Sequence, residues 1–241
     1  MFFSLYNELL YRPLFNVLVF LYETVSFYDL GIAIIALTVL IRLALYPLSR
    51  HAIESQKNMM AVQPEVKKLQ EKYKDNKEEQ MKRVMELYKE KKVNPFSGCI
   101  PILIQLPIII ALYQVFLAGF DDGSLSSLYS FIPNPGSLNH SFLGILDLSL
   151  KKNIILAVLA GALQFYQSKM MLDEQKKVQA APSNDFSANM SKQMTYTMPV
   201  VTVVISYTLP AGLALYWTVT NLISIIQQKQ ILGRKKTERK Q

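Results

Sequence analysis

An arginine lies inside one of the most apolar stretches of this sequence. From Leu30 to Leu48 almost every residue is apolar, yet Arg42 follows Ile41 before the stretch ends. An arginine at the centre of a membrane-spanning helix costs roughly 2.5–3.5 kcal/mol on insertion scales, so such residues are rare and by default mark a functional cavity. Arg42 is therefore the leading candidate for a site that attracts negative charge. The alternative is that Arg42 lies near the helix end and extends its guanidinium to the membrane surface.

Polar side chains recur at helical spacing in several other apolar segments. Thr38 lies four residues before Arg42, so the two share one helical face. Further stripes comprise Gln164 and Gln167; Thr195, Thr202 and Ser206; and Trp217, Asn221, Ser224 and Gln228. Any single stripe is equally well explained by hydrogen bonds between helices, worth about 0.6 kcal/mol per contact. Four stripes together favour one water-containing cavity that the helices share.

Covalent and metal chemistry have little support in this sequence. The two histidines, His51 and His140, are predicted to lie on opposite sides of a membrane, so no serine–histidine pair forms. The single cysteine, Cys99, has no neighbouring histidine and allows no internal disulfide. The sequence therefore predicts neither an enzyme nor a metal or cofactor site.

The elements that must position these side chains follow from the distribution of apolar residues. Half of the residues are apolar (51%), and their clustering is typical of a polytopic membrane protein. A helix needs roughly 20 residues to cross about 30 Å of hydrocarbon. Division at the polar segments leaves five candidate spans near this length, at 30–48, 99–119, 153–170, 194–209 and 212–230. We therefore predict an all-α, five-helix membrane bundle.

The basic residues orient these spans. Lysine and arginine are concentrated in 49–94, in 171–192 and after Lys229, whereas 120–150 contains none. The positive-inside rule then places the first three regions in the cytoplasm and the N-terminal region outside. The pair Lys151-Lys152, at the outer edge of the third span, is the exception.

Two helical segments are expected outside the spans. In 1–29, apolar residues at helical spacing are interrupted by Glu8, Arg12, Asn16 and Glu23, which predicts an amphipathic helix on the outer membrane surface rather than a signal peptide. The alternative for this segment is a poor transmembrane helix. In 49–94, two amphipathic stretches separated near Asp75-Asn76 predict an antiparallel cytoplasmic hairpin. Pro64 fits the first turn of its first helix.

The whole chain is thus expected to divide into functional segments in a simple order. These are an outer helix (1–29), the first span (30–48), the cytoplasmic hairpin (49–94), the remaining four spans (95–232) with an outer cap loop (120–152) and a cytoplasmic loop (171–192), and a basic tail (233–241).

Several sequence blocks fall in a fixed order on these elements. They are Thr38 and Arg42 with Tyr46-Pro47-Leu48, Asn94-Pro95 through Pro101 with Gln105 and Pro107, Ala111-Leu112-Tyr113, Met198-Pro199, and Pro210 through Trp217 with Asn221 and Gln227-Gln228. Together they resemble the YidC-type membrane protein insertases, across roughly residues 10–232, as a minimal core of bacterial type.

This resemblance implies a five-helix bundle around a hydrophilic groove that opens to the cytoplasm and to lipid and is sealed toward the outside. It implies that Arg42 is the positive charge of the groove and that the 49–94 hairpin is mobile. The groove residues expected on this basis are Arg42, Thr38, Gln105, Gln164, Gln167, Tyr216, Trp217 and Asn221.

The resemblance also implies a function as a membrane protein insertase and chaperone, without a cofactor. The expected location is a bacterial-type inner (cell) membrane, with the N-terminus outside and the C-terminus in the cytoplasm. Nascent membrane proteins and the lipid bilayer are the expected partners, with the ribosome and the secretion channel as further candidates. No specific recognition of nucleic acid is expected.

A transporter for an anion or small solute is the main alternative, because it too would use a buried arginine. The sequence shows neither an internal repeat nor a pair of matching broken spans, which are the usual signs of a transporter. A solute flux assay on the purified protein separates the two functions.

Overall fold

The computed structural model describes residues 2–94, 100–117, 125, 127–136, 138–178 and 186–238. This part of the chain is mainly helical, as predicted. Its helices are α1 (Phe2–Tyr6), the π-helical turn η1 (Asn7–Tyr11), α2 (Arg12–Thr24), α3 (Leu30–Ala44), α4 (Tyr46–Lys72), α5 (Lys77–Glu90), α6 (Ile100–Leu117), α8 (Ile154–Val178), α9 (Phe186–Thr208) and α10 (Ala211–Glu238). One antiparallel strand pair, β1 (Ser141–Phe142) and β2 (Leu146–Asp147), departs from an all-α fold.

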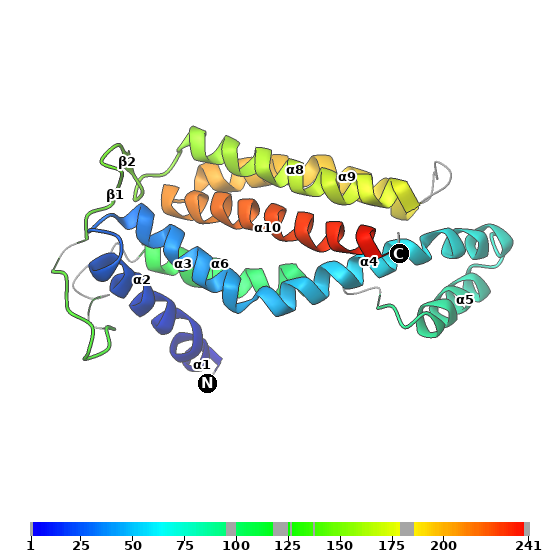
Figure 1. Ribbon diagram of the computed structural model, residues 1–241, viewed down its shortest axis with the longest axis horizontal. Coiled ribbons are helices and arrows are strands. Elements are labelled where there is room, and N and C mark those ends of the chain that lie inside the picture. Colours follow the sequence, from blue (N-terminus) through cyan, green and yellow to red (C-terminus); the bar gives the residue numbers. More distant parts are fainter. Residues whose placement is uncertain are drawn as a thin grey trace.

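Helix α10 lies at the centre of the bundle. Figure 1 shows it between the α8–α9 pair on one side and α3 with α6 on the other, and it contacts all four helices. Its side chains Leu213, Ala214 and Tyr216 belong to the main apolar core, together with Leu112 of α6 and Ile34 of α3. The residues predicted to line a groove are therefore carried by α10 and by helices that pack around it.

The five apolar segments predicted from the sequence fall on α3, α6, α8, α9 and α10, except that the first (30–48) extends past the end of α3 into the start of α4. Within the described residues, one helix (Ile154–Lys177) is long and apolar enough to cross a membrane unaided. Helices α3 and α4 would count as a second span only if they are taken together, because the chain bends by 63° between them, and Leu103–Leu117 is apolar but shorter. The count of five crossings therefore stays a prediction.

The α4–α5 hairpin projects from one end of the bundle (Figure 1). Its helices end and begin on either side of the predicted break, and the side chain of Asn76 caps α5 by accepting a hydrogen bond from the Glu79 amide (3.1 Å).

The predicted position of Pro64 is wrong, because this residue lies inside the continuous helix α4 rather than in a first turn. A proline inside a helix costs about 3 kcal/mol or more. Packing on both sides of the proline offsets this cost, since Ile53 and Met60 pack in a cluster with residues of α8 and α10, whereas Val66 packs against Leu87 of α5.

At the other end of the bundle, the N-terminal helix packs closely against the rest of the protein. Phe15 and Leu18 of α2 are fully buried, and so is Asn16, which the sequence indicated only as an interruption. The Asn16 amide donates to the Ser127 carbonyl (3.1 Å), and its carbonyl oxygen accepts a hydrogen bond from the Tyr129 amide (2.6 Å). The polar residue on this apolar face therefore binds the loop at Ser127 and Tyr129.

The loop segment 138–152 in turn caps α10. The carbonyls of Leu148 and Leu150 accept hydrogen bonds from the Gly212 and Ala211 amides, both at 2.9 Å. Because the first amides of a helix have no partner within it, these bonds satisfy the start of α10. The loop that the sequence indicates only as an irregular cap is thus tied to the central helix.

Candidate functional site

Arg42 lies in the last turn of α3 and is half-buried. No ion pair joins its guanidinium to a carboxylate within the described parts of the chain. Tyr216 of α10 lies in its vicinity. A partly buried cation without a neutralising carboxylate is an attractive site for an acidic group from outside the protein.

Tyr216 connects this cation to a third helix. Its side chain is 1% exposed, and its hydroxyl oxygen accepts a hydrogen bond from Nε2 of Gln105 on α6 at 2.7 Å. A buried tyrosine hydroxyl usually needs such a partner. The structure therefore brings three of the predicted site residues together, one each from α3, α6 and α10.

Thr38 lies one turn before Arg42 and is fully buried. Its hydroxyl donates to the carbonyl of Ile34 at 2.6 Å, within its own helix. A threonine commonly satisfies its hydroxyl in this way inside a helix. In this state of the protein Thr38 is a packing residue beside the arginine.

The other predicted residues lie on α8 and α10. Asn221 is buried, and its amide donates to the Ala160 carbonyl of α8 at 3.1 Å. Trp217, Gln164 and Gln167 are half-buried. No hydrogen bond joins these four residues to Arg42, Gln105 or Tyr216 among the residues that the structure describes. The predicted set therefore divides into an arginine cluster and a group along the α8–α10 contact.

Replacing Asn221 with leucine is expected to lower the stability of the folded protein by about 1 kcal/mol. The substitution removes a hydrogen bond between helices and leaves the Ala160 carbonyl without it, and such bonds in membrane proteins are worth about 0.6 to 1.7 kcal/mol. Thermal unfolding in detergent measures the change. Leu222→Ala, at the exposed neighbouring position, is the control, and an Asn221 variant as stable as the parent contradicts this role.

Two buried oxygen atoms along the polar stripes have no hydrogen-bond partner among the described residues. They are Oγ of Ser206 on α9 and Oε1 of Gln228 on α10. Buried polar atoms of this kind are commonly satisfied by internal water. Helices α9 and α10 therefore contain buried polar positions suited to bound water. Sequence spacing places Ser206 and Gln228 in the polar stripes, but it does not indicate that their oxygen atoms lack partners.

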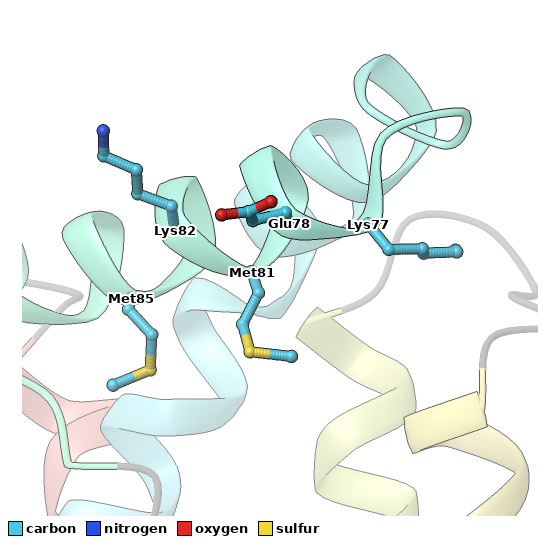
Figure 2. A pocket seen from close by; sticks show the side chains of 5 residues that line it. All are labelled: Lys77, Glu78, Met81, Lys82 and Met85. Carbon is cyan, nitrogen blue, oxygen red and sulfur yellow. The ribbon is translucent and has the colours of Figure 1, made fainter.

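A shallow hollow of about 460 Å³ lies on α5, away from the arginine cluster. Figure 2 shows Met81 and Met85 projecting to the same side of this helix, with Lys77, Glu78 and Lys82 around them. The hollow is formed by the hairpin alone, so it is not the groove predicted beside Arg42. That groove stays a prediction.

Comparison with known proteins matches nearly all of the chain. The family described as "60Kd inner membrane protein" matches residues 20–239. A Membrane protein insertase YidC from Fusobacterium nucleatum subsp. nucleatum is 37% identical over 227 residues, covering 93% of this chain and 98% of that protein. The YidC of Francisella tularensis subsp. novicida is 40% identical over 199 residues, which cover 82% of this chain but only 31% of the relative.

A solved structure shows the same fold. The crystal structure titled "Active YidC insertase crystal structure with the first transmembrane domain resolved" is 26% identical in sequence, with a TM-score of 0.60. The match covers 92% of this chain and 45% of that one. This chain therefore spans nearly the full length of the Fusobacterium relative, but about a third to a half of the longer proteins.

Proposed function

The chain belongs to the YidC family of membrane protein insertases, and we propose that it assists insertion by attracting the polar flank of an arriving transmembrane segment to Arg42. The observation that carries this mechanism is the half-buried guanidinium, which has no carboxylate partner in the described residues and lies beside a buried tyrosine. The family is one of insertases rather than of catalytic enzymes, and the comparisons give no support to a transporter.

Insertion is difficult because the polar flank of a transmembrane segment must cross hydrocarbon. Its backbone and charged groups lose their hydration there, and each unsatisfied polar group costs several kcal/mol. A groove that holds water part of the way into the membrane shortens this path. The buried polar oxygens of Ser206 and Gln228 support such hydration between the helices.

Within this mechanism Tyr216 and Gln105 support the cation instead of contacting the substrate. Tyr216 is fully buried, so it cannot line an open path in this state. The hydrogen bond from Gln105 fixes the position of the Tyr216 hydroxyl group in the vicinity of Arg42. We assign contact with a passing segment to Trp217, the half-buried neighbour of Tyr216 on α10.

Site-specific crosslinking tests the path. A photo-crosslinking residue in place of Trp217 should react with the transmembrane segment of a stalled nascent chain. The matched control is the same replacement at Ile155, which is exposed near the start of α8. Equal reaction from both positions, or reaction from Ile155 alone, would contradict a substrate path beside α10.

The variant Gln105→Glu tests whether the cation must lack a counter-ion. Glutamate would place a carboxylate next to Tyr216 and Arg42, so it should neutralise the attraction for acidic substrate flanks. We expect substrates with acidic flanks to lose at least threefold in insertion relative to neutral ones in reconstituted vesicles. Gln105→Leu removes the hydrogen bond without adding charge, and it should preserve the preference for acidic flanks. The same loss of preference in both variants would refute a charge effect.

The remaining parts of the proposal concern partners and orientation. Nascent membrane proteins and lipid follow from the insertase function. A cytoplasmic position for the α4–α5 hairpin, with the N-terminus outside, rests on the distribution of lysine and arginine. The ribosome and the secretion channel stay candidate partners, and the mobility of the hairpin stays a prediction. The basic residues after Leu232 lie where the structure describes no side chains.

A further inference from the structure

Two turns at the end of the bundle opposite the hairpin hold large apolar residues in an unusual backbone conformation. Phe27 and Tyr28, between α2 and α3, have φ angles of +53° and +62°. Leu143, in the turn between β1 and β2, has a φ of +53°, and Gly144 follows at +68°. Positive φ is unfavourable for bulky residues, and such residues are concentrated at functional sites.

The two turns are joined into one surface. The Asp29 carboxylate accepts a hydrogen bond from the Leu143 amide at 2.6 Å and, through its other oxygen, one from the Ile32 amide at 2.9 Å. The ring of Phe142 lies directly against Gly31, where a Cβ atom would overlap it. In Figure 1, β1 and β2 lie at the end where α3, α8 and α10 begin.

Four apolar side chains of these turns are exposed. Phe27 is 93% exposed and Ile145 is 85% exposed, and Tyr28 and Leu143 are also exposed. We call these four residues the outer tip. Other apolar side chains of the loop pack inward, such as the fully buried Leu148, and within the outer tip the ring of Tyr28 keeps an edge contact with the buried Tyr22. Exposed apolar clusters of this kind usually mark an interaction site.

The surroundings of the outer tip indicate what covers it. The exposed apolar surface continues on Ile154 and Ile155, at the start of the helix that is long and apolar enough to span a membrane. The exposed lysines Lys151 and Lys152 lie between the strand pair and this helix, and the Lys152 amide is fixed by a hydrogen bond to the Tyr207 carbonyl (2.9 Å). Apolar side chains beside lysines match the boundary between lipid acyl chains and phosphate groups.

We propose that the outer tip inserts into the headgroup boundary of the lipid bilayer, with Lys151 and Lys152 next to the lipid phosphates. The lipid surface is thus the partner of these two turns. The positive φ angles are maintained because Asp29 fixes the turns from within the protein, while lipid contact stabilises the exposed side chains. This inference does not depend on the role of Arg42.

Fluorescence quenching in membranes tests this inference. The full chain, with Cys99→Ser, would carry a single cysteine at position 145 (Ile145→Cys) labelled with an environment-sensitive dye. It would be reconstituted in vesicles of phosphatidylethanolamine and phosphatidylglycerol. Ile155→Cys on α8 is the lipid-exposed reference, and Lys82→Cys on α5 is the water-exposed reference. We expect nitroxide lipids to quench the label at 145 at least half as strongly as the label at 155, and iodide to quench it at least twofold less than the label at 82.

The two quenchers distinguish the possible outcomes. A label at 145 that behaves like the label at 82 overturns the inference, because the tip would then lie in water. Protection from both quenchers also overturns it, because a protein surface would then cover the tip. Phe27→Cys is a second labelling site in the same surface and is expected to give the same result, which guards against a local effect of one substitution.

Discussion

Replacement of Arg42 by glutamate is expected to reduce the insertion of substrates with acidic outer tails at least tenfold more than that of substrates with neutral tails. A unit charge about 10 Å away, at an effective dielectric constant near 20, contributes about 1.7 kcal/mol, so reversal changes the interaction by about 3 kcal/mol before screening by water. Since about 1.4 kcal/mol corresponds to a tenfold change, the difference between the two substrates is measurable in reconstituted vesicles.

The matched control is Arg50→Glu, which makes the same charge change eight residues further on. Arg50 is exposed on α4 and pairs with Glu54 at 3.2 Å, so its reversal should leave the ratio between acidic and neutral substrates unchanged. If Arg42→Glu inserts both substrates as the parent does, attraction by the guanidinium has no part in the mechanism. Such a result would leave the insertase family assignment intact.

Replacement of Gly161 by leucine is expected to destabilise the protein by about 3 kcal/mol, a typical upper value for overpacking. A Cβ atom at this position of α8 would overlap Cγ2 of Val203 and lie 3.1 Å from the Pro199 carbonyl of α9. The two helices must therefore separate to accept a larger side chain. Small residues allow such close approach between helices in membranes. Thermal unfolding followed by the fluorescence of Trp217 measures the change.

Two further variants identify the cause. Ala162→Leu adds a larger side chain at the next position, which is exposed, so it should change stability little. Adding Val203→Ala to Gly161→Leu removes part of the overlap and should restore part of the lost stability. If Ala162→Leu is as destabilising as Gly161→Leu, the effect belongs to α8 itself and not to its contact with α9.

The positions of the main helices could be predicted from the sequence because long apolar segments with polar ends have few alternatives. The prediction was wrong at Pro64, where local preference indicates a helix start but packing of Met60 and Val66 on either side of it maintains one helix. The short strand pair could not be predicted, since two-residue strands leave no periodic pattern in the sequence.

The candidate site was predictable in part. Arg42 is evident from sequence because a charge in an apolar segment is costly, and the structure places it beside Tyr216 and Gln105. Helical spacing places residues on one face, but it does not determine which neighbour each face meets. Thus Thr38 bonds to its own helix and Asn221 joins α8, although both share stripes with other site residues.

The carboxylate of Asp29 fixes the distance between the outer tip and the residues of α3. One of its oxygens begins α3 and the other holds the turn at Leu143, so the outer tip and the first residue of α3 move as one body. Arg42 lies 13 positions beyond Asp29 in sequence, or about 20 Å along a helix at about 1.5 Å per residue. If the tip floats at the lipid surface, the depth of the guanidinium is fixed from that surface. The Arg42 guanidinium would then lie at a constant distance from the lipid surface that the tip contacts, whatever the thickness of the bilayer.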